Sequence, residues 1–308
     1  MGFLLGIDLG GSSIKALALT SEGERLIERH RRFDATAAME WAKEIRVLVH
    51  EMESELGAAA VSVGLSAPGL VAADGASIQT MPGRLQGLEQ LNWADYLQRP
   101  HPVPVLNDAQ AALAGEAWVG AGQGVDNVLL ITLGTGVGGA AKVDGRLLRG
   151  AIGRAGHVGH ICLDPKGTPD ICRTPGSLEL AVGNCTILDR TEGRFKTTLD
   201  LVAAAETGDT QAQQWWQETV HRLACGLVSL ENVLDPELIL IGGGIARAGA
   251  ALFDPLADYM NQMEWLVSDH RVMIRPAALG EWAGAYGAAL TGYQRVVTGE
   301  GASNESSC

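Results

Sequence analysis

The amino-acid sequence predicts an α/β protein of two lobes. Its 308 residues suit two domains of ordinary size, since single domains usually span roughly 100 to 200 residues. Segments with helical spacing of apolar residues alternate with short apolar runs, which is typical of helices packed on a sheet. A glycine-rich strand, turn and strand pattern occurs twice, as FLLGIDLGGSSIKALALT and as VLLITLGTGVGGAAKVDG, and this repetition indicates an internal duplication.

The first, smaller lobe is predicted over residues 1–107. Apolar residues 3–9 and the alternating segment 14–20 flank the turn GGSS and predict a hairpin. Residues 40–55 carry apolar side chains at helical spacing, and the apolar run 60–65 predicts a buried strand.

The second, larger lobe is predicted over residues 108–281. It follows a short strand over 103–106 and opens with an alanine-rich helix over 108–119. The first residue of this helix, Asp108, is of a type favoured at helix N-caps. The second hairpin begins with a strand over 128–133.

After the second hairpin, the sequence predicts a turn-rich stretch over 149–176 and then mainly helices. Helices are expected over roughly 178–233, and a strand over 238–241 precedes a glycine-rich loop. A final helix over 282–297 is expected to complete the smaller lobe, and the polar residues 298–308 are expected to form a disordered tail.

The composition argues against several classes of function. The formal net charge of −13 repels phosphate backbones, so neither DNA nor RNA is expected as a partner. The N-terminus lacks the basic segment of a signal peptide, and no stretch approaches the ~20 apolar residues of a membrane span. The scattered cysteines do not describe a disulfide framework; they are Cys162, Cys172, Cys185, Cys225 and Cys308. We therefore expect a cytoplasmic protein without membrane contact.

The two hairpin turns are candidate phosphate sites. GTGVGG has the glycine spacing of a dinucleotide fingerprint, but that fingerprint and the Walker loop both require a helix directly after the loop, whereas these turns lie between strands. An ordinary tight turn would explain one of them. Two equivalent turns at the heads of duplicated halves favour backbone N–H groups that hold a polyphosphate. The residues assigned to it are Gly10, Gly11, Ser12, Lys15, Gly134, Thr135 and Gly136.

A third loop, IGGGIARAG, occupies residues 241–249 between a strand and a helix. It suits a close approach to the base and ribose of a nucleotide through Gly243 and Gly244, with a packing turn as the alternative. Asp8 ends a strand beside the first turn and is placed to bind Mg²⁺ directly or through water. The alternative for Asp8 is an aspartate that caps the turn.

Five motifs, in order, resemble the ROK family (repressors, open reading frames, kinases) of bacterial sugar kinases. They are DLGGSSIK, LNDAQAALAGEAW, LITLGTGVGGAAKVDGRLLRGAIGRAGHVGH, IGGGIARAG and LGEWAGAYGAAL. The resemblance implies the two-lobed actin-like ATPase (ribonuclease H-like) fold, ATP and Mg²⁺ as cofactors, and a homodimer. Family members with a repressor role carry a helix-turn-helix domain before the first hairpin, where this sequence begins, so we expect a kinase.

Residue by residue, the resemblance implies that Asp108 is the catalytic base and Asn107 a neighbouring sugar ligand. His160 and Glu179 match further sugar ligands. His157 stands where most of the family has Glu, and the bacterial N-acetylmannosamine kinases are similar to this sequence in having His there. An imidazole can donate a hydrogen bond to a carbonyl, which an ionised carboxylate cannot, so His157 favours an N-acetyl sugar.

The zinc motif of the family is degenerate in this sequence. The family pairs a His with a CxCGxxGC run, and from His160 the three cysteine positions fall on Asp170, Cys172 and Ser177. Structural zinc sites generally use four Cys or His ligands. No structural zinc is therefore expected, although His160, Asp170 and Cys172 remain as three conceivable metal ligands.

These features predict ATP-dependent phosphorylation of a hexose or N-acetylhexosamine, at the 6-hydroxyl, with Asp108 accepting the hydroxyl proton. The alternative is a non-catalytic sugar sensor of the same fold, which the presence of Asp8, Asp108 and both phosphate turns disfavours. The sequence leaves open the identity of the sugar, a phosphate donor other than ATP, and the oligomeric state.

Overall fold

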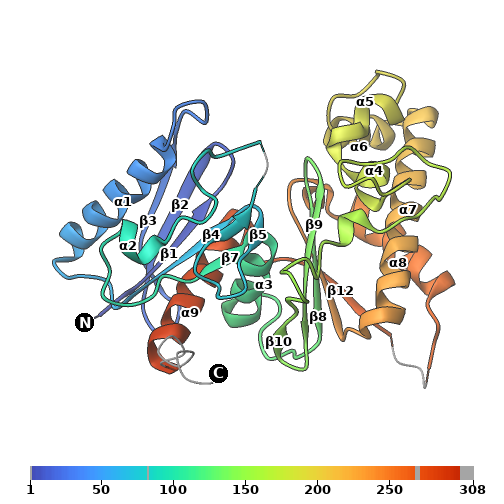
Figure 1. The fold of residues 1–308 in the computed structure, drawn as a ribbon. Helices are drawn as coiled ribbons and strands as arrows, with labels where there is room; N and C mark the ends of the chain where they lie inside the picture. The colour runs from blue at the N-terminus through green and yellow to red at the C-terminus, as the bar shows by residue number, and fades with distance from the viewer. Residues whose placement is uncertain (1, 82, 268–270, 299–308) are drawn as a thin grey trace. The chain divides into compact units, whose positions relative to one another are not determined.

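The computed structural model describes residues 2–81, 83–267 and 271–298 (Figure 1). The chain forms two compact units. Unit 1 comprises residues 1–124, 149–154 and 278–308, and unit 2 comprises residues 125–148 and 155–277. The tail predicted over 298–308 lies, after Thr298, outside the described residues.

Unit 1 is built on a five-stranded sheet with the order β3-β2-β1-β4-β7. The hairpin β1–β2 is antiparallel, and β4 and β7 continue the sheet in parallel with β1. Its strands are β1 (Leu4–Leu9), β2 (Ser13–Leu19), β3 (Arg25–Arg32), β4 (Ser62–Ala67) and β7 (Val105–Asn107), with a small separate pair, β5 (Leu70–Val71) and β6 (Ile78–Thr80). Its helices are α1 (Glu40–Leu56), α2 (Trp93–Tyr96), α3 (Asp108–Val119) and α9 (Ala283–Thr298).

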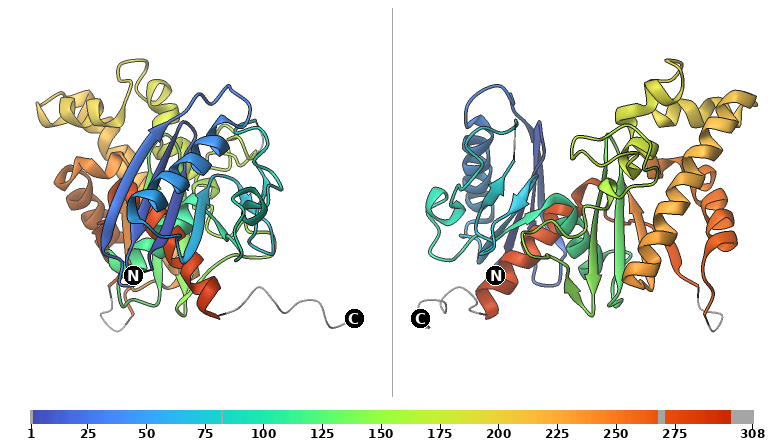
Figure 2. Two further views of the ribbon diagram at one scale, coloured as in Figure 1. Left: turned by 90° about the vertical axis from the view of Figure 1, so that its left-hand side faces the viewer. Right: turned by 45° about the vertical axis from the view of Figure 1, so that its right-hand side comes forward.

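The two faces of this sheet are covered by different helices. Because side chains alternate along a strand, Leu5 and Ile7 pack with Trp41 of α1, whereas Leu4 packs with Ala285 of α9 on the opposite face. Figure 2 shows α1 on one side of the sheet and α9 on the other. Helix α3 packs against α9.

Helix α9 lies at backbone contact distance from its neighbours. A Cβ atom added at Gly6 of β1 would lie 1.8 Å from the carbonyl oxygen of Ala285, and one added at Gly287 of α9 would lie 1.8 Å from that of Ala111. Only glycine permits such approaches. Part of the high glycine content of the sequence, 40 residues, is explained by this packing.

A buried carboxylate fastens the segments where the chain leaves unit 1 and returns to it. Glu116 is fully buried and accepts hydrogen bonds from the backbone N–H groups of Ala121 (2.9 Å), Ala278 (3.1 Å) and Leu279 (2.7 Å). Charge-assisted bonds of this kind are about twice as strong as neutral ones. The Glu116 side chain therefore holds both the segment at Ala121, where the chain leaves unit 1, and the segment at Ala278, where it returns.

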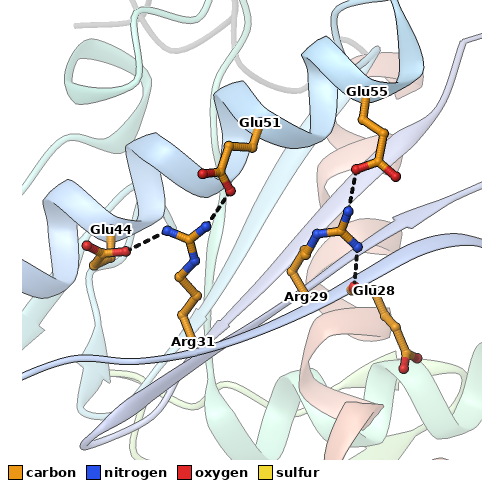
Figure 3. Close-up of polar contacts among 6 residues, drawn as sticks. All are labelled: Glu28, Arg29, Arg31, Glu44, Glu51 and Glu55. Atoms are coloured by element: carbon orange, nitrogen blue, oxygen red, sulfur yellow. Dashed lines mark hydrogen bonds and ion pairs between the residues drawn. The ribbon is translucent and has the colours of Figure 1, made fainter.

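Strand β3 lies at the edge of the unit 1 sheet and is joined to α1 by ion pairs (Figure 3). The guanidinium of Arg31 lies 3.0 Å from Glu44 and 2.5 Å from Glu51, and Arg29 pairs with Glu55. These pairs are partly exposed, so each stabilises the fold by at most about 1 kcal/mol. A charged edge strand also resists pairing with other chains.

Unit 2 repeats the strand arrangement of unit 1. Its sheet has the order β10-β9-β8-β11-β12, with an antiparallel hairpin β8–β9 and with β11 parallel to β8. The strands are β8 (Val128–Leu133), β9 (Val137–Val143), β10 (Arg146–Leu147), β11 (Leu238–Gly242) and β12 (Met273–Pro276). The equivalent order in the two units confirms the predicted duplication.

The helices of unit 2 pack on its sheet through a continuous apolar core that includes Ile131 and Leu227. They are α4 (Leu178–Val182), α5 (Ile187–Arg190), α6 (Thr198–Glu206), α7 (Thr210–Leu234) and α8 (Ala250–Met263). No helix within the described ranges is long and apolar enough to cross a membrane.

The division into units differs from the predicted boundary at residues 107 and 108. Helix α3 belongs to unit 1 because it packs against α9. The chain first passes from unit 1 into unit 2 after Gly124. The short segment 149–154 also groups with unit 1, where Gly153 lies against Val71.

We expect Gly287→Ala to lower the free energy of unfolding by about 1 to 3 kcal/mol, because the added methyl group would meet the Ala111 carbonyl. In an open helix the same change would raise it by about 1 kcal/mol. Urea denaturation followed by circular dichroism measures the difference. Gln294→Ala, at an exposed position of the same helix, is the control and should change stability by less than about 0.5 kcal/mol. A stabilised Gly287→Ala variant would contradict the close packing of α9.

Candidate active site

The first hairpin turn exposes its backbone. It is closed by a hydrogen bond of 2.8 Å from the N–H of Gly10 to the carbonyl of Ser13, and Gly11 and Ser12 are exposed. Exposed N–H groups at such a turn can bind an anion. Lys15 lies opposite Asp8 in the hairpin register, and its amine is 3.4 Å from the carboxylate of Glu281.

Asp8 is the penultimate residue of β1 and occupies a confined position. The hydroxyl of Ser66 on β4 donates to its Oδ1 atom at 2.7 Å, and a Cβ atom added at Gly284 of α9 would lie 2.7 Å from the carboxylate. Burial raises the pKa of Asp8 to about 6 and the negative charge of Asp108 adds to this, while Ser66 and Lys15 act in the opposite direction. A desolvated carboxylate of this kind is suited to a hard cation.

Asn107 and Asp108 lie at the junction between β7 and α3. Asn107, rather than Asp108 as predicted, is the N-cap: its Oδ1 atom accepts from the N–H of Ala109 at 3.1 Å, and its amide donates to the carbonyl of Gly69 at 3.1 Å. The backbone of Asn107 is still extended, as in the strand, and this conformation lets its side chain reach an N–H group of the first helical turn. Asp108 is consequently the first helical residue, and it is exposed.

The second hairpin turn is braced by Glu179, at the start of α4. Its Oε2 atom accepts from the N–H of Val137 at 3.0 Å, and a Cβ atom added at Gly136 would lie 2.1 Å from it. The carbonyl groups of Gly134 and Thr135 accept from the N–H groups of residues 184 and 185. The turn therefore has a fixed shape, with Thr135 exposed at its tip.

Helix α4, which carries Glu179, is itself anchored by a buried arginine. The guanidinium of Arg190 donates to the carbonyl groups of Val182 and Gly183 and to the hydroxyl of Thr219. Burial lowers the pKa of Arg190 to about 10, which leaves it charged at neutral pH. This cation binds the carbonyl groups at the end of α4 and so fixes Glu179.

The third glycine loop has a packing explanation at one of its two predicted residues. Gly243 has a φ angle of +88°, and a Cβ atom there would lie 2.3 Å from the carbonyl of Leu133. Gly243 is therefore required by the backbone itself. A Cβ atom at Gly244 would meet only the end of the Arg247 side chain, at 3.8 Å, which leaves this residue open to a ligand.

His157 precedes a short 3₁₀ turn, η1 (Val158–His160), that packs on β9, and His160 is the last residue of this turn. The Nδ1 atom of His160 lies 2.7 Å from Oδ2 of Asp170. Asp170 also accepts from the N–H groups of Cys172 (2.8 Å) and Thr174 (2.9 Å). Burial alone would raise the pKa of Asp170, but the bonds from His160, these N–H groups and Ser177 hold it below its ordinary value.

The residues at the degenerate zinc motif offer three candidate ligands, one fewer than structural zinc sites generally use. Ligand atoms of His160, Asp170 and Cys172 lie within 4.8 Å of one another. Two ligands at about 2.0 to 2.1 Å from a tetrahedral zinc are about 3.3 Å apart, whereas Nδ1 of His160 and Oδ2 of Asp170 are at direct hydrogen-bond distance. The position matched to a third cysteine is Ser177, whose hydroxyl also bonds to Asp170.

The structure brings together several predicted residues within each unit. Unit 1 groups Asp8 with Lys15 and with the charge of Asp108, and unit 2 groups Glu179 with the turn at Gly136. The sequence interpretation missed Ser66 and Gly284 as neighbours of Asp8. Their only signals were a serine in a buried run and a glycine inside a helix, which are common features.

Comparisons with known proteins find related sugar kinases. The sequence profile described as "ROK family" matches residues 4–294. A glucokinase of Halalkalibacterium halodurans is 32% identical over 92% of both chains. The N-acetylmannosamine kinase of Shigella boydii is 29% identical over 79% of this chain and 84% of its own length.

Solved structures with related sequences share the fold. The ROK hexokinase of Thermus thermophilus has a TM-score of 0.82 and 29% identity, and the alignment covers 96% of this chain and 99% of the other. A ROK family glucokinase from Streptomyces griseus, determined with glucose and AMPPNP, has a TM-score of 0.75 and 27% identity over 95% of this chain and 100% of its own. With the actin-like ATPase fold and a family match over nearly its whole length, this chain belongs to the ROK family and is one of its sugar kinases.

Proposed function

We propose that this enzyme transfers the terminal phosphoryl group of ATP to the 6-hydroxyl of a hexose or N-acetylhexosamine, with Asp108 as the general base. The observation that carries this proposal is the position of Asp108 as an exposed carboxylate on the first turn of α3, in the same unit as Asp8 and the exposed turn at residues 10–12. The glucokinase and N-acetylmannosamine kinase relatives, and the related glucokinase determined with a nucleotide analogue, support the reaction class.

Phosphoryl transfer requires an aligned hydroxyl, neutralised phosphates and a proton acceptor. The N–H groups of Gly11 and Ser12, together with Lys15, would hold phosphate oxygens. Asp108 would take the hydroxyl proton as the oxygen attacks phosphorus. Asp8 is the residue that would hold Mg²⁺, which supplies positive charge to the phosphates when bound.

The sugar side is assigned to the polar groups of Asn107, His157, His160 and Glu179. Asn107 already makes structural hydrogen bonds with Gly69 and Ala109, and Glu179 makes one with Val137. Each has further lone pairs or N–H groups for a hydroxyl. A coupled ADP-release assay over glucose, mannose, fructose, allose, N-acetylglucosamine and N-acetylmannosamine tests the proposal. Sugar binding without any turnover would instead identify a sensor.

We expect Asp108→Asn to lower kcat by about 100-fold or more while sugar binding persists, because the amide keeps the shape and loses the basicity. Turnover and calorimetry on the same preparation measure the two effects. Asp258→Asn, at an exposed position of α8, is the control and should keep normal turnover. Near-normal turnover by Asp108→Asn would remove Asp108 from the mechanism.

We expect His157→Glu to shift the ratio of kcat/KM toward plain hexoses and away from N-acetylated sugars. An ionised carboxylate cannot donate to an acetamido carbonyl, and an unpaired buried polar group costs about 1 to 3 kcal/mol, or one to two orders of magnitude. His101→Glu, at an exposed loop position, makes the same change of charge elsewhere. An unchanged sugar ranking with a uniform fall in rate would exclude His157 as the selectivity residue.

The raised pKa of Asp8 predicts a pH dependence of stability in Mg²⁺-free protein. A carboxyl group with an ordinary pKa of 3.8 and a folded value of about 6 binds its proton more tightly in the folded state. Its contribution to stability is therefore fully present below pH 4 and is lost as the pH rises through 6. Mg²⁺ favours the ionised form, so its stabilising effect should shrink as the pH falls below 6.

Thermal unfolding with EDTA and with Mg²⁺, at pH 7.5 and 5.5, measures this dependence. Asp8→Asn is the reference, since it removes the titrating group and keeps the shape. The wild-type protein should gain stability relative to Asp8→Asn as the pH falls in EDTA. Parallel pH profiles of the two proteins would show that Asp8 is not the responsible group.

A further inference from the structure

We infer that Asp170 is a positioning residue: it holds the His160 ring with its proton on Nδ1 and leaves Nε2 as a bare acceptor for a sugar hydroxyl, without a metal ion. This inference rests on the proposed role of His160 as a sugar ligand. It assigns to Asp170 a function that is distinct from metal binding.

The contact between the two side chains fixes the direction of the hydrogen bond. Nδ1 of His160 and Oδ2 of Asp170 are 2.7 Å apart, and the Asp170 side chain is fully buried. An ionised carboxylate only accepts hydrogen bonds, so Nδ1 must be the donor. In a neutral imidazole the other nitrogen then carries a lone pair and no proton.

Asp170 is held more firmly than the ring it contacts. Its Oδ1 atom accepts from the N–H groups of Cys172 and Thr174, and its own N–H donates to the carbonyl of Thr174 at 2.9 Å. The His160 side chain is 21% exposed, whereas that of Asp170 is 0% exposed. The buried carboxylate therefore sets the orientation of the ring, and the ring reaches from Asp170 toward the surface.

The loop that carries Asp170 keeps its shape through its own backbone. Cys162 pairs with Ser177 and Pro169 with Pro175 as isolated bridges, and the N–H of Leu163 donates to the carbonyl of Gly176 at 2.9 Å. These bonds close the loop at its base and near its tip. A metal ion is not needed to hold it.

Asp170→Asn is the discriminating variant because it can preserve the loop and move the ring proton of His160 from Nδ1 to Nε2. The amide oxygen can still accept from the N–H groups of Cys172 and Thr174, which directs the NH₂ group toward His160. Nδ1 must then accept, and the ring proton moves to Nε2. The matched control is Asp164→Asn, since Asp164 is an exposed aspartate of the same loop that accepts from the N–H of Lys166.

The tautomer is read from long-range ¹H–¹⁵N correlations of the histidine rings at a pH where the imidazole is neutral, with His160→Gln for assignment. We expect Nδ1–H in the wild type and in Asp164→Asn, and Nε2–H in Asp170→Asn. The sugar KM should rise about tenfold or more in Asp170→Asn, with a smaller change in kcat and none in Asp164→Asn. Metal analysis should find less than one zinc per chain, and a zinc-selective chelator with Mg²⁺ in excess should leave activity unchanged.

Three results would overturn the inference. The first is a His160 proton on Nε2 in the wild type. The second is a sugar KM of Asp170→Asn equal to that of Asp164→Asn although the His160 proton has moved to Nε2. The third is one zinc per chain whose removal abolishes activity. The proposed function fails separately: a wild type that turns over no sugar, or an active Asp108→Asn, would refute the reaction or its base while the tautomer still reports on Asp170.

Discussion

The close packing of α9 is the constraint on which the arrangement of Asp8 and Asp108 in unit 1 depends. Gly6 and Gly287 let this helix touch both the sheet and α3 at backbone distance. Gly284, at the start of the same helix, lies against the Asp8 carboxylate and contributes to the desolvation that raises its pKa. The helix that begins with Asp108 is thereby fixed relative to the strand that carries Asp8 near its end. Two close contacts between main chains, at Gly6 and at Gly287, therefore hold together residues that are distant in the sequence.

Much of the fold could be predicted from local patterns. The helix expected over 108–119 is α3 within the same bounds, and the strand expected over 128–133 is β8, because the apolar spacing and the turn residues lie within a few residues of each other. The N-cap was misassigned because Asn and Asp are almost equally favoured at that position. Asn107 is the cap because its backbone is still extended, whereas Asp108 is already helical. The unit boundary differs because the contact of α3 with α9 joins segments separated by most of the chain.

The sequence offers candidate site residues but not the contacts that these residues make. Glu179 was assigned only to the sugar, yet it also braces the turn at Gly136, and this depends on a bond to Val137 across 42 positions. In the sequence, Asp170 is visible only as the residue at a cysteine position of a degenerate zinc motif. In the structure, its buried carboxylate contacts His160 and Cys172 by hydrogen bonds in place of a shared metal ion. Side-chain geometry of this kind follows from tertiary packing, which residue spacing does not encode.

The interrupted path of the chain through unit 1 has a consequence for biosynthesis. One face of the strands that begin the protein packs mainly against α9, near the end of the chain, so Leu4, Leu17 and Leu19 lack most of their partners while unit 2 is translated. Unit 2 is complete by residue 277 and can fold as it leaves the ribosome. The N-terminal hairpin therefore spends most of translation with an exposed apolar surface that chaperones recognise, and the commitment of the whole enzyme to its native state comes with its last helix.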